Sequence, residues 1–325
     1  MESHSFNGWH YKVNPDFKNQ SDLYDIKADK HPILPTELFH YYKIDKNSVD
    51  SLLNNYIYAN HPREFNDPFD CNRDLVSFES TSLDDVIKLN NGVFPVDKIK
   101  TLYNSDDPKD KFDLYNDLLF LLYNVTYMKL GIFCMTNNDS NMGMWSYYTN
   151  HRGFVLKFNL SKLPENHWGP FPINYTNEFK RIDYSKFKNS SFLYQSNIKA
   201  KCWEPENEWR LFFWGPNVMK IPGQNPPKAH DRIFFYDPKT IDEVILGYNF
   251  FESNEYDLDK SNFEIHHIRL RKNVKLKRKM LKFIIMNKHK VSIINIKKES
   301  SSDLSSRPVE LIRISSNKYI IKYIG

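Results

Sequence analysis

The chain has 325 residues and 15% aromatic side chains, which suffices to bury a large core and excludes a generally disordered protein. It has 10 glycines and neither a Gly-x-Gly-x-x-Gly nor a Walker-type loop, which argues against folds that hold nucleotides in Gly-rich loops. The net charge of +5 is uneven, because residues 269–298 hold twelve of the 45 Lys and Arg residues and none of the 40 acidic residues.

The apolar pattern predicts an α+β core domain at residues 36–275. A polar, irregular N-terminal extension at 1–35 precedes it, with Trp9 and Tyr11 expected to pack onto the core. We expect a mixed or antiparallel central sheet with helical insertions. Strands are predicted at residues 38–43, 57–60, 131–135, 154–158, 207–214, 233–236, 244–247 and 265–270. Helices are predicted after a cap at Asn47 or Ser48, in much of 82–130 after a capping box at Ser82 and Asp85, and at 141–148 and 184–200.

The end of the chain, residues 276–325, reads as a small, basic, β-rich appendage. Apolar runs at 282–286 and 291–296 flank a polar turn and predict one hairpin. Runs at 309–314 and 319–323 predict a second hairpin, after a Ser-rich linker.

The acid-free basic run favours an anionic partner, although most such runs are simply solvated surface. We expect nucleic acid as that partner. No zinc-finger, helix-turn-helix or ribonucleoprotein signature indicates a specific reading mode. The expected contacts are Arg269, Arg271, Lys272, Lys275, Lys277, Arg278, Lys279 and Lys282.

The cysteines indicate a reducing compartment. Cys71, Cys134 and Cys202 are odd in number, far apart and in no Cys-x-x-Cys arrangement. The most apolar helix candidate, residues 114–130, carries polar and charged residues and is expected to be buried rather than to span a membrane. We therefore expect a cytoplasmic protein without a membrane partner, and the sequence leaves its oligomeric state open.

The stretch at 203–214 is the most informative part of the chain. Strand alternation predicts that Glu206, Glu208 and Arg210 share one face, and that Trp209, Leu211 and Phe213 share the other. Burial of Trp209 would fix the strand while the charged groups project together. The ordinary alternative is a half-exposed strand with a surface ion pair.

Four motifs occur in an order that resembles a bacterial family of unknown function, identified by its N-D-P-F-D, M-W-S-H-Y and E-W-R motifs. They are residues 66–70, residues 144–153, residues 206–211 and residues 243–247. The resemblance covers roughly residues 36–270, so the appendage lies outside it. Tyr147 stands where that family has a His, which argues against a catalytic histidine in this helix.

A looser resemblance is to the ADP-ribosyltransferases. Their pattern is a His or Arg on a first strand, an aromatic residue or Ser on a second, and a Glu-x-Glu on a late strand. His40, Tyr58 and Glu206-x-Glu208 occur in that order. The resemblance implies an ADP-ribosyltransferase-like core and an NAD-dependent enzyme, of the kind found among toxins and defence effectors, with nucleic acid as a candidate target.

This resemblance also implies a role for each residue. Glu208 would stabilise the positive charge that builds at the ribose carbon, and Glu206 would deprotonate the acceptor. His40 would bind the adenosine-side ribose and Tyr58 would stack on nicotinamide. Further NAD contacts are expected from Arg63 and Arg210 to the diphosphate, and from Trp145 and Tyr148 at the rim of the pocket. NAD is a substrate here, and no metal is expected.

Two other classes stay open. Asp67, Asp70, Glu206 and Glu208 would form a divalent-metal site for phosphodiester cleavage if their loop met the late strand. The other class is a non-enzymatic nucleic-acid-binding or regulatory module, for which the basic run would suffice.

Overall fold

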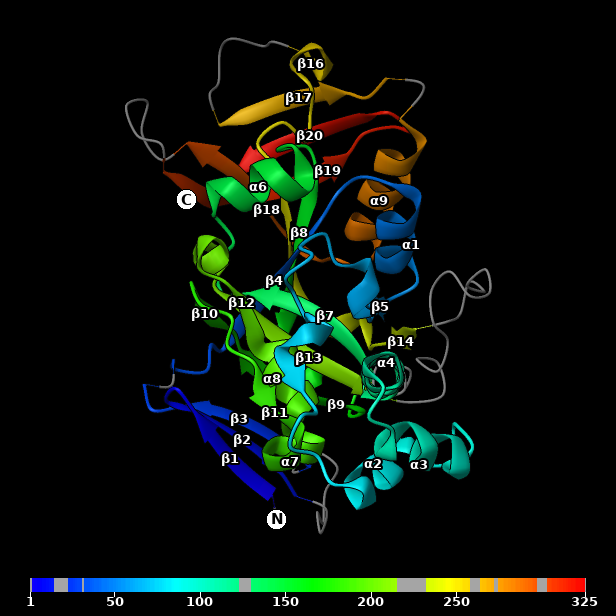
Figure 1. Ribbon diagram of the computed structural model, residues 1–325. Coiled ribbons are helices and arrows are strands. Elements are labelled where there is room, and N and C mark those ends of the chain that lie inside the picture. Colours follow the sequence, from blue (N-terminus) through cyan, green and yellow to red (C-terminus); the bar gives the residue numbers. More distant parts are fainter. Residues whose placement is uncertain are drawn as a thin grey trace.

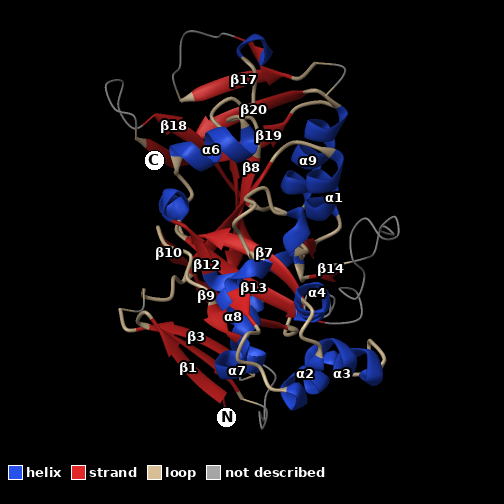
Figure 2. Ribbon diagram, viewed as in Figure 1, coloured by secondary structure: helices blue, strands red, loops and turns tan. Residues whose placement is uncertain are grey.

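The computed structural model in Figure 1 describes residues 2–14, 23–30, 32–122, 130–214, 232–257, 264–271, 274–296 and 303–324. These residues form an α+β fold around an 11-stranded sheet that runs through most of the molecule (Figures 1 and 2). The strands, in spatial order, are β16 (Tyr256–Asp257), β17 (Ile265–Arg269), β20 (Lys318–Tyr323), β19 (Leu304–Arg313), β18 (Lys290–Ile296), β15 (Ile241–Leu246), β8 (Phe154–Asn159), β4 (Glu37–Tyr42), β7 (Leu130–Thr136), β13 (Glu208–Trp214) and β9 (His167–Pro172).

The sheet is mixed. Within the described residues its strand pairs are antiparallel except β15 with β18. The smaller sheets are β1 (Glu2–Phe6), β2 (Trp9–Val13) and β3 (Tyr24–Ala28); β5 (Tyr56–Tyr58) with β14 (Ile233–Phe235); β6 (Val76–Ser77) with β11 (Ile182–Asp183); and β10 (Asn174–Thr176) with β12 (Ile198–Ala200). The expected α+β class with a mixed sheet is therefore confirmed.

Helices cover both faces of the sheet. They are α1 (Lys46–Leu53), α2 (Leu83–Asn90), α3 (Val96–Asn104), α4 (Pro108–Phe120), α6 (Met142–Thr149), α7 (Tyr184–Phe187), α8 (Ser191–Asn197) and α9 (Lys275–Met286). Asn141 caps α6 and Ser82 caps α2, as the sequence predicts for α2. In the described part of the chain, no helix is long and apolar enough to cross a membrane.

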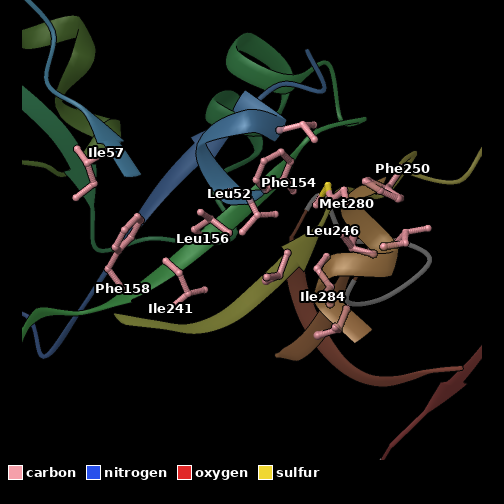
Figure 3. Close-up of a cluster of buried hydrophobic side chains, with 14 of the residues drawn as sticks. Leu52, Ile57, Phe154, Leu156, Phe158, Ile241, Leu246, Phe250, Met280 and Ile284 are labelled. Carbon is pink, nitrogen blue, oxygen red and sulfur yellow. The ribbon is translucent and has the colours of Figure 1, made fainter. Parts of the chain in front are cut away.

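The strand β13 divides two environments. Trp209, Leu211 and Phe213 point to one face, which we call the α9 face because α1 and α9 pack on it. Figure 3 shows part of its core, where Leu52 of α1 and Met280 and Ile284 of α9 pack against apolar side chains of β8 and β15. The alternate residues Glu208, Arg210 and Phe212 point to the opposite face, which we call the α8 face.

Two predictions about the chain ends were wrong. Residues 1–35 are not irregular throughout, because residues 2–13 and 24–28 contribute the three strands β1 to β3, joined between β1 and β2 by Asn7 and Gly8 at positive φ. Residues 282–286 form the end of α9 rather than a hairpin strand. The expected packing of Tyr11 onto the core is confirmed, since it is fully buried.

The C-terminal strands are part of the central sheet. The second predicted hairpin is confirmed as β19 and β20, but β18, β19 and β20 lie between β15 and β17 in that sheet. The segment expected as an appendage thus shares the apolar core of the α9 face, to which Val291 and Ile321 contribute.

Candidate functional site

Arg210 lies at the centre of a buried group of charges on the α8 face. Its side chain is fully buried. It donates from Nε to Glu208 Oε1 (2.6 Å), from Nη2 to Asp70 Oδ2 (2.5 Å) and from Nη1 to the Ser196 carbonyl (2.7 Å). Its guanidinium lies 5.3 Å from the centre of the Phe65 ring. The Arg210 side chain thus joins β13 to α8 and to the loop that carries Asp70.

Lys199 on β12 extends this group on the other side of Glu208. Its Nζ donates to Glu208 Oε2 and to Glu206 Oε2, both at 2.6 Å. The hydroxyl of Tyr148 on α6 donates to Glu206 Oε1 at 2.7 Å. Asp70, Arg210, Glu208, Lys199 and Glu206 therefore form one continuous chain of ion pairs, which we call the buried charge network.

The local backbone explains why both glutamates reach Lys199. Glu206 ends the 3₁₀ helix η7 (Lys201–Glu206), and β13 begins at Glu208. Between them Asn207 adopts φ of 46°, a left-handed conformation that Asn tolerates better than most residues. The alternation predicted that the two carboxylates would be neighbours on one strand face. Instead, they converge on Lys199 from two different elements.

The network holds three carboxylates but only two cations. Burial would raise the pKa of Glu208, but Arg210 and Lys199 hold that pKa well below its ordinary value. At Asp70, burial raises the pKa, and the attraction of Arg210 offsets only part of the effect. The excess negative charge is therefore least compensated at Asp70, the end of the network farthest from Lys199.

Asp70 also lines a pocket of about 430 Å³. The pocket is built from a loop with two short 3₁₀ helices, η2 (Pro62–Glu64) and η3 (Arg73–Leu75). His61 caps η2 and Asn72 caps η3. The lining residues are Pro62, Arg63, Phe65, Asp67, Pro68, Asp70, Cys71, Asn72, Arg73 and Asp74.

Two carboxylate oxygens at this pocket have no hydrogen-bond partner among the described residues. Asp67 accepts the Phe69 N–H through Oδ1, but its Oδ2 is buried without a donor. Asp70 accepts from Arg210 through Oδ2, and its Oδ1 is likewise buried without a donor. Asp67 is 7% exposed and Asp70 is 8% exposed, so each unmatched oxygen carries a desolvation cost of about 1–3 kcal/mol or more.

The structure brings together some of the residues that the sequence singled out and corrects their expected roles. Glu206, Glu208, Arg210 and Tyr148 meet in or beside the buried charge network. Both oxygens of Glu206 and of Glu208 already accept from protein donors, so neither carboxylate is open to a substrate. Arg210 is fully buried and cannot reach a diphosphate.

His40 does not share a face with Glu208. The register pairs Phe39 with Thr136 and Glu208 with Thr136, so Phe39 and Glu208 point to one face and His40 to the other. His40 stacks on Phe133 of the α9 face and bonds the Cys134 carbonyl through Nδ1 at 2.6 Å. The sheet itself therefore separates the first-strand His from the late-strand Glu.

The aromatic residues and Arg63 have separate places. Trp145 was expected at the cofactor but is a core residue, since it is fully buried and donates from Nε1 to the Asp139 carbonyl. Tyr58 donates its hydroxyl to Glu64, which belongs to η2 beside the pocket. Arg63, expected at the diphosphate, does line the pocket.

The metal-site hypothesis required a divalent metal ion between the carboxylates, but the structure has the Arg210 guanidinium there. The loop with Asp70 does meet the late strand, but Arg210 lies between Asp70 and Glu208. Within the part of the chain that the structure describes, no three His, Cys, Asp or Glu side chains gather in an arrangement that could hold a metal ion.

Lys199 is the main residue that the sequence analysis missed. It falls in a segment predicted as helix, whereas the structure has α8 followed by β12. Tyr175 of the paired strand β10 was also missed, and its hydroxyl accepts the Glu208 N–H at 2.7 Å. Buried carboxylates need cationic partners, and this requirement of the Glu-x-Glu was a signal that could have prompted a search for Lys199.

Comparison with known proteins identifies no activity. No curated protein and no solved structure matches the chain. The matching family model covers the segment that contains most of α6, Lys199 and most of the buried charge network, and it begins after the pocket loop. That model is described as a protein of unknown function (DUF2971), and it matches residues 144–211.

Proposed function

We propose that the protein is an NAD-using, ADP-ribosyltransferase-like enzyme that binds the dinucleotide in the pocket formed by residues 62–74. The observation that carries this proposal is the pair of buried, unpartnered carboxylate oxygens on Asp67 and Asp70. The sequence analysis expected NAD to bind between His40 and Glu208. These residues lie on opposite faces of the sheet, so we assign NAD to the pocket instead.

The inner part of the pocket favours a cation that can donate hydrogen bonds. Asp67 is acidic, and the buried charge network that ends at Asp70 has one more carboxylate than it has cations. The nicotinamide ring of NAD is positively charged and carries a carboxamide with two N–H donors. Such a group would satisfy the oxygens that the protein leaves unmatched.

The rim of the pocket favours the opposite charge. Arg63 and Arg73 line it, and both are exposed. Guanidinium groups pair well with diphosphates because they donate two parallel hydrogen bonds. A ligand with a cationic ring inside and a diphosphate outside therefore matches both ends of the pocket.

This polarity suits the chemistry of ADP-ribosyl transfer. The bond between nicotinamide and ribose breaks with its electron pair leaving on nicotinamide, and positive charge builds at the ribose carbon. The acceptor then bonds to that carbon and releases its proton. We assign charge stabilisation to Asp70, in place of Glu208, because one of its oxygens is uncommitted at the pocket.

The test compares two substitutions at the same pocket. Asp67→Asn keeps the acceptor for the Phe69 N–H but removes the charge, whereas Asp74→Asn removes an exposed acid at the rim. We expect NAD binding, measured by calorimetry, to weaken about tenfold or more in Asp67→Asn and to change little in Asp74→Asn. Thermal unfolding of both variants checks that the fold is kept.

Nicotinamide release tests the reaction itself. With nucleic acid and cell extract supplied as acceptors, the protein should release nicotinamide, and Asp70→Asn should slow the release about 100-fold or more. Absence of NAD binding at millimolar concentrations, or equal binding by the two Asn variants, would overturn the assignment of the pocket. If the protein binds NAD but releases no nicotinamide with any of these acceptors, the proposed transferase activity is wrong.

A further inference from the structure

The helix α9 presents a row of lysines to solvent. Lys275, Lys279 and Lys282 are all exposed and follow one another at intervals of four and three residues, which places them on one side of a helix. At about 1.5 Å per residue the row spans roughly 10 Å along the helix axis. We call these three residues the α9 lysine row.

The other side of α9 is buried, which fixes the orientation of the row. Met280, Leu281 and Ile284 are fully buried in the core of the α9 face, and Figure 3 shows Met280 and Ile284 there. Helix α1 packs beside α9 (Figure 1). The lysines are thus held on a rigid surface and not on a free amphipathic helix.

Two neighbouring basic residues already form ion pairs within the protein, so they do not extend the α9 lysine row. Lys277 was expected as a nucleic-acid contact, but it is buried, forms an ion pair with Glu255 and lies over the Phe250 ring. Arg271 pairs with Glu252 at 3.3 Å. Of the other expected contacts, Lys272 lies outside the described residues.

We propose that the α9 lysine row is a docking surface for the phosphate backbone of nucleic acid. The segment 269–298 contains no acid, so the row carries no acidic side chain from its own segment that would repel phosphates. Because α9 is packed flat on the core, its lysines reach phosphates rather than base edges, and binding is independent of sequence.

A membrane surface is the competing polyanion, and the packing of α9 disfavours it. Interfacial helices bury their apolar side in the lipid, but the apolar side of α9 is already buried in the protein. The surface does not depend on the proposed pocket, which is built from residues 62–74. Nucleic-acid binding and NAD binding can therefore fail separately.

The experiment measures binding of the full chain to a fluorescent DNA duplex of random sequence across a series of salt concentrations. The test variant carries Lys275→Gln, Lys279→Gln and Lys282→Gln. A matched control carries Lys88→Gln, Lys100→Gln and Lys109→Gln, which are exposed lysines of α2, α3 and α4. A third variant replaces the row by Arg and keeps its charge.

We expect the slope of log K against log salt to become shallower by about 2–3 in the row variant. The control and the Arg variant should keep the slope of the unmodified protein. Absence of binding to duplex at low salt, or an equal loss in the control, would overturn the proposal. Binding to vesicles of anionic lipid that depends on the row, without duplex binding, would overturn it in favour of a membrane.

Discussion

The two faces of β13 differ sharply although they alternate residue by residue. Trp209, Leu211 and Phe213 pack in the apolar core of the α9 face. On the α8 face, Glu208 and Arg210 are as deeply buried, but they belong to the buried charge network, which lies beside the apolar cluster that holds Phe212. Equal burial therefore serves two different purposes on the two sides of one strand.

The comparison indicates that the α9 face stabilises the fold and that the buried charge network of the α8 face has a functional role. Burial of apolar area contributes about 25 cal/mol per Å², so the α9 face stabilises the fold directly. Buried ion pairs lose much of their Coulomb energy to desolvation and are weak evidence for stability. A network that adds little stability, and that ends at a pocket in a carboxylate with one unmatched oxygen, is better explained by a functional role.

The largest effect should come from breaking the charged face. Arg210→Met replaces the guanidinium with an apolar side chain and leaves Asp70 and Glu208 without their shared cation. We expect a loss of about 3–5 kcal/mol in the free energy of unfolding, measured in urea. Lys201→Met is the matched control, because its pair with Glu204 is half exposed, and it should cost less than about 1 kcal/mol. A loss in Arg210→Met no larger than in the control would contradict the account of the charged face.

The apolar face should respond differently to a substitution one residue away. Leu211→Ala removes a fully buried side chain from the core of the α9 face. We expect a loss of about 2–5 kcal/mol in urea unfolding. The loss should be the same at pH 5 and pH 8, because no charged group is exchanged. A strong pH dependence of this loss would show that the two faces are not independent.

A smaller effect should follow acidification. Burial lowers the pKa of His40 to about 4, whereas an unfolded His titrates near pH 6.5. Between about pH 4 and pH 6.5, His40 is therefore protonated in the unfolded chain and neutral in the folded chain. The free energy of unfolding falls as the pH drops from about 6.5 to 4.

The contribution of His40 should be on the order of 1–3 kcal/mol. His40→Asn, whose amide can replace the Nδ1 bond to the Cys134 carbonyl, should flatten the dependence of the melting temperature on pH in this range. The slope that remains should reflect the other histidines whose pKa burial lowers, among them His61, His167 and His289. An unchanged slope in the variant would mean that His40 is charged in the folded protein.

The sequence predicted local features well where one pattern decided them. The alternation from Glu208 to Phe213 is found as expected, and Trp209 is buried. The prediction for residues 282–286 failed because Phe283 to Met286 is a short apolar run that fits a strand or a helix equally. The helical spacing appears only when Leu276, Met280 and Leu281 are included.

The site was less predictable because distant segments build it. Asp70 and Arg210 are 140 residues apart in sequence, and no local pattern relates them. Nor does the sequence reveal that Asn207 turns the chain between Glu206 and Glu208, so that both carboxylates meet Lys199. The Asn7-Gly8 turn between β1 and β2 is, in contrast, a local hairpin signal that the sequence analysis overlooked.

The most direct test of the central claim is a crystal structure of the protein soaked with NAD. The account predicts that the nicotinamide lies within hydrogen-bond distance of Asp67 Oδ2 and Asp70 Oδ1, with the diphosphate toward Arg63 and Arg73. A dinucleotide bound on the α9 face beside His40, or no dinucleotide in crystals soaked at saturating concentration, would contradict it.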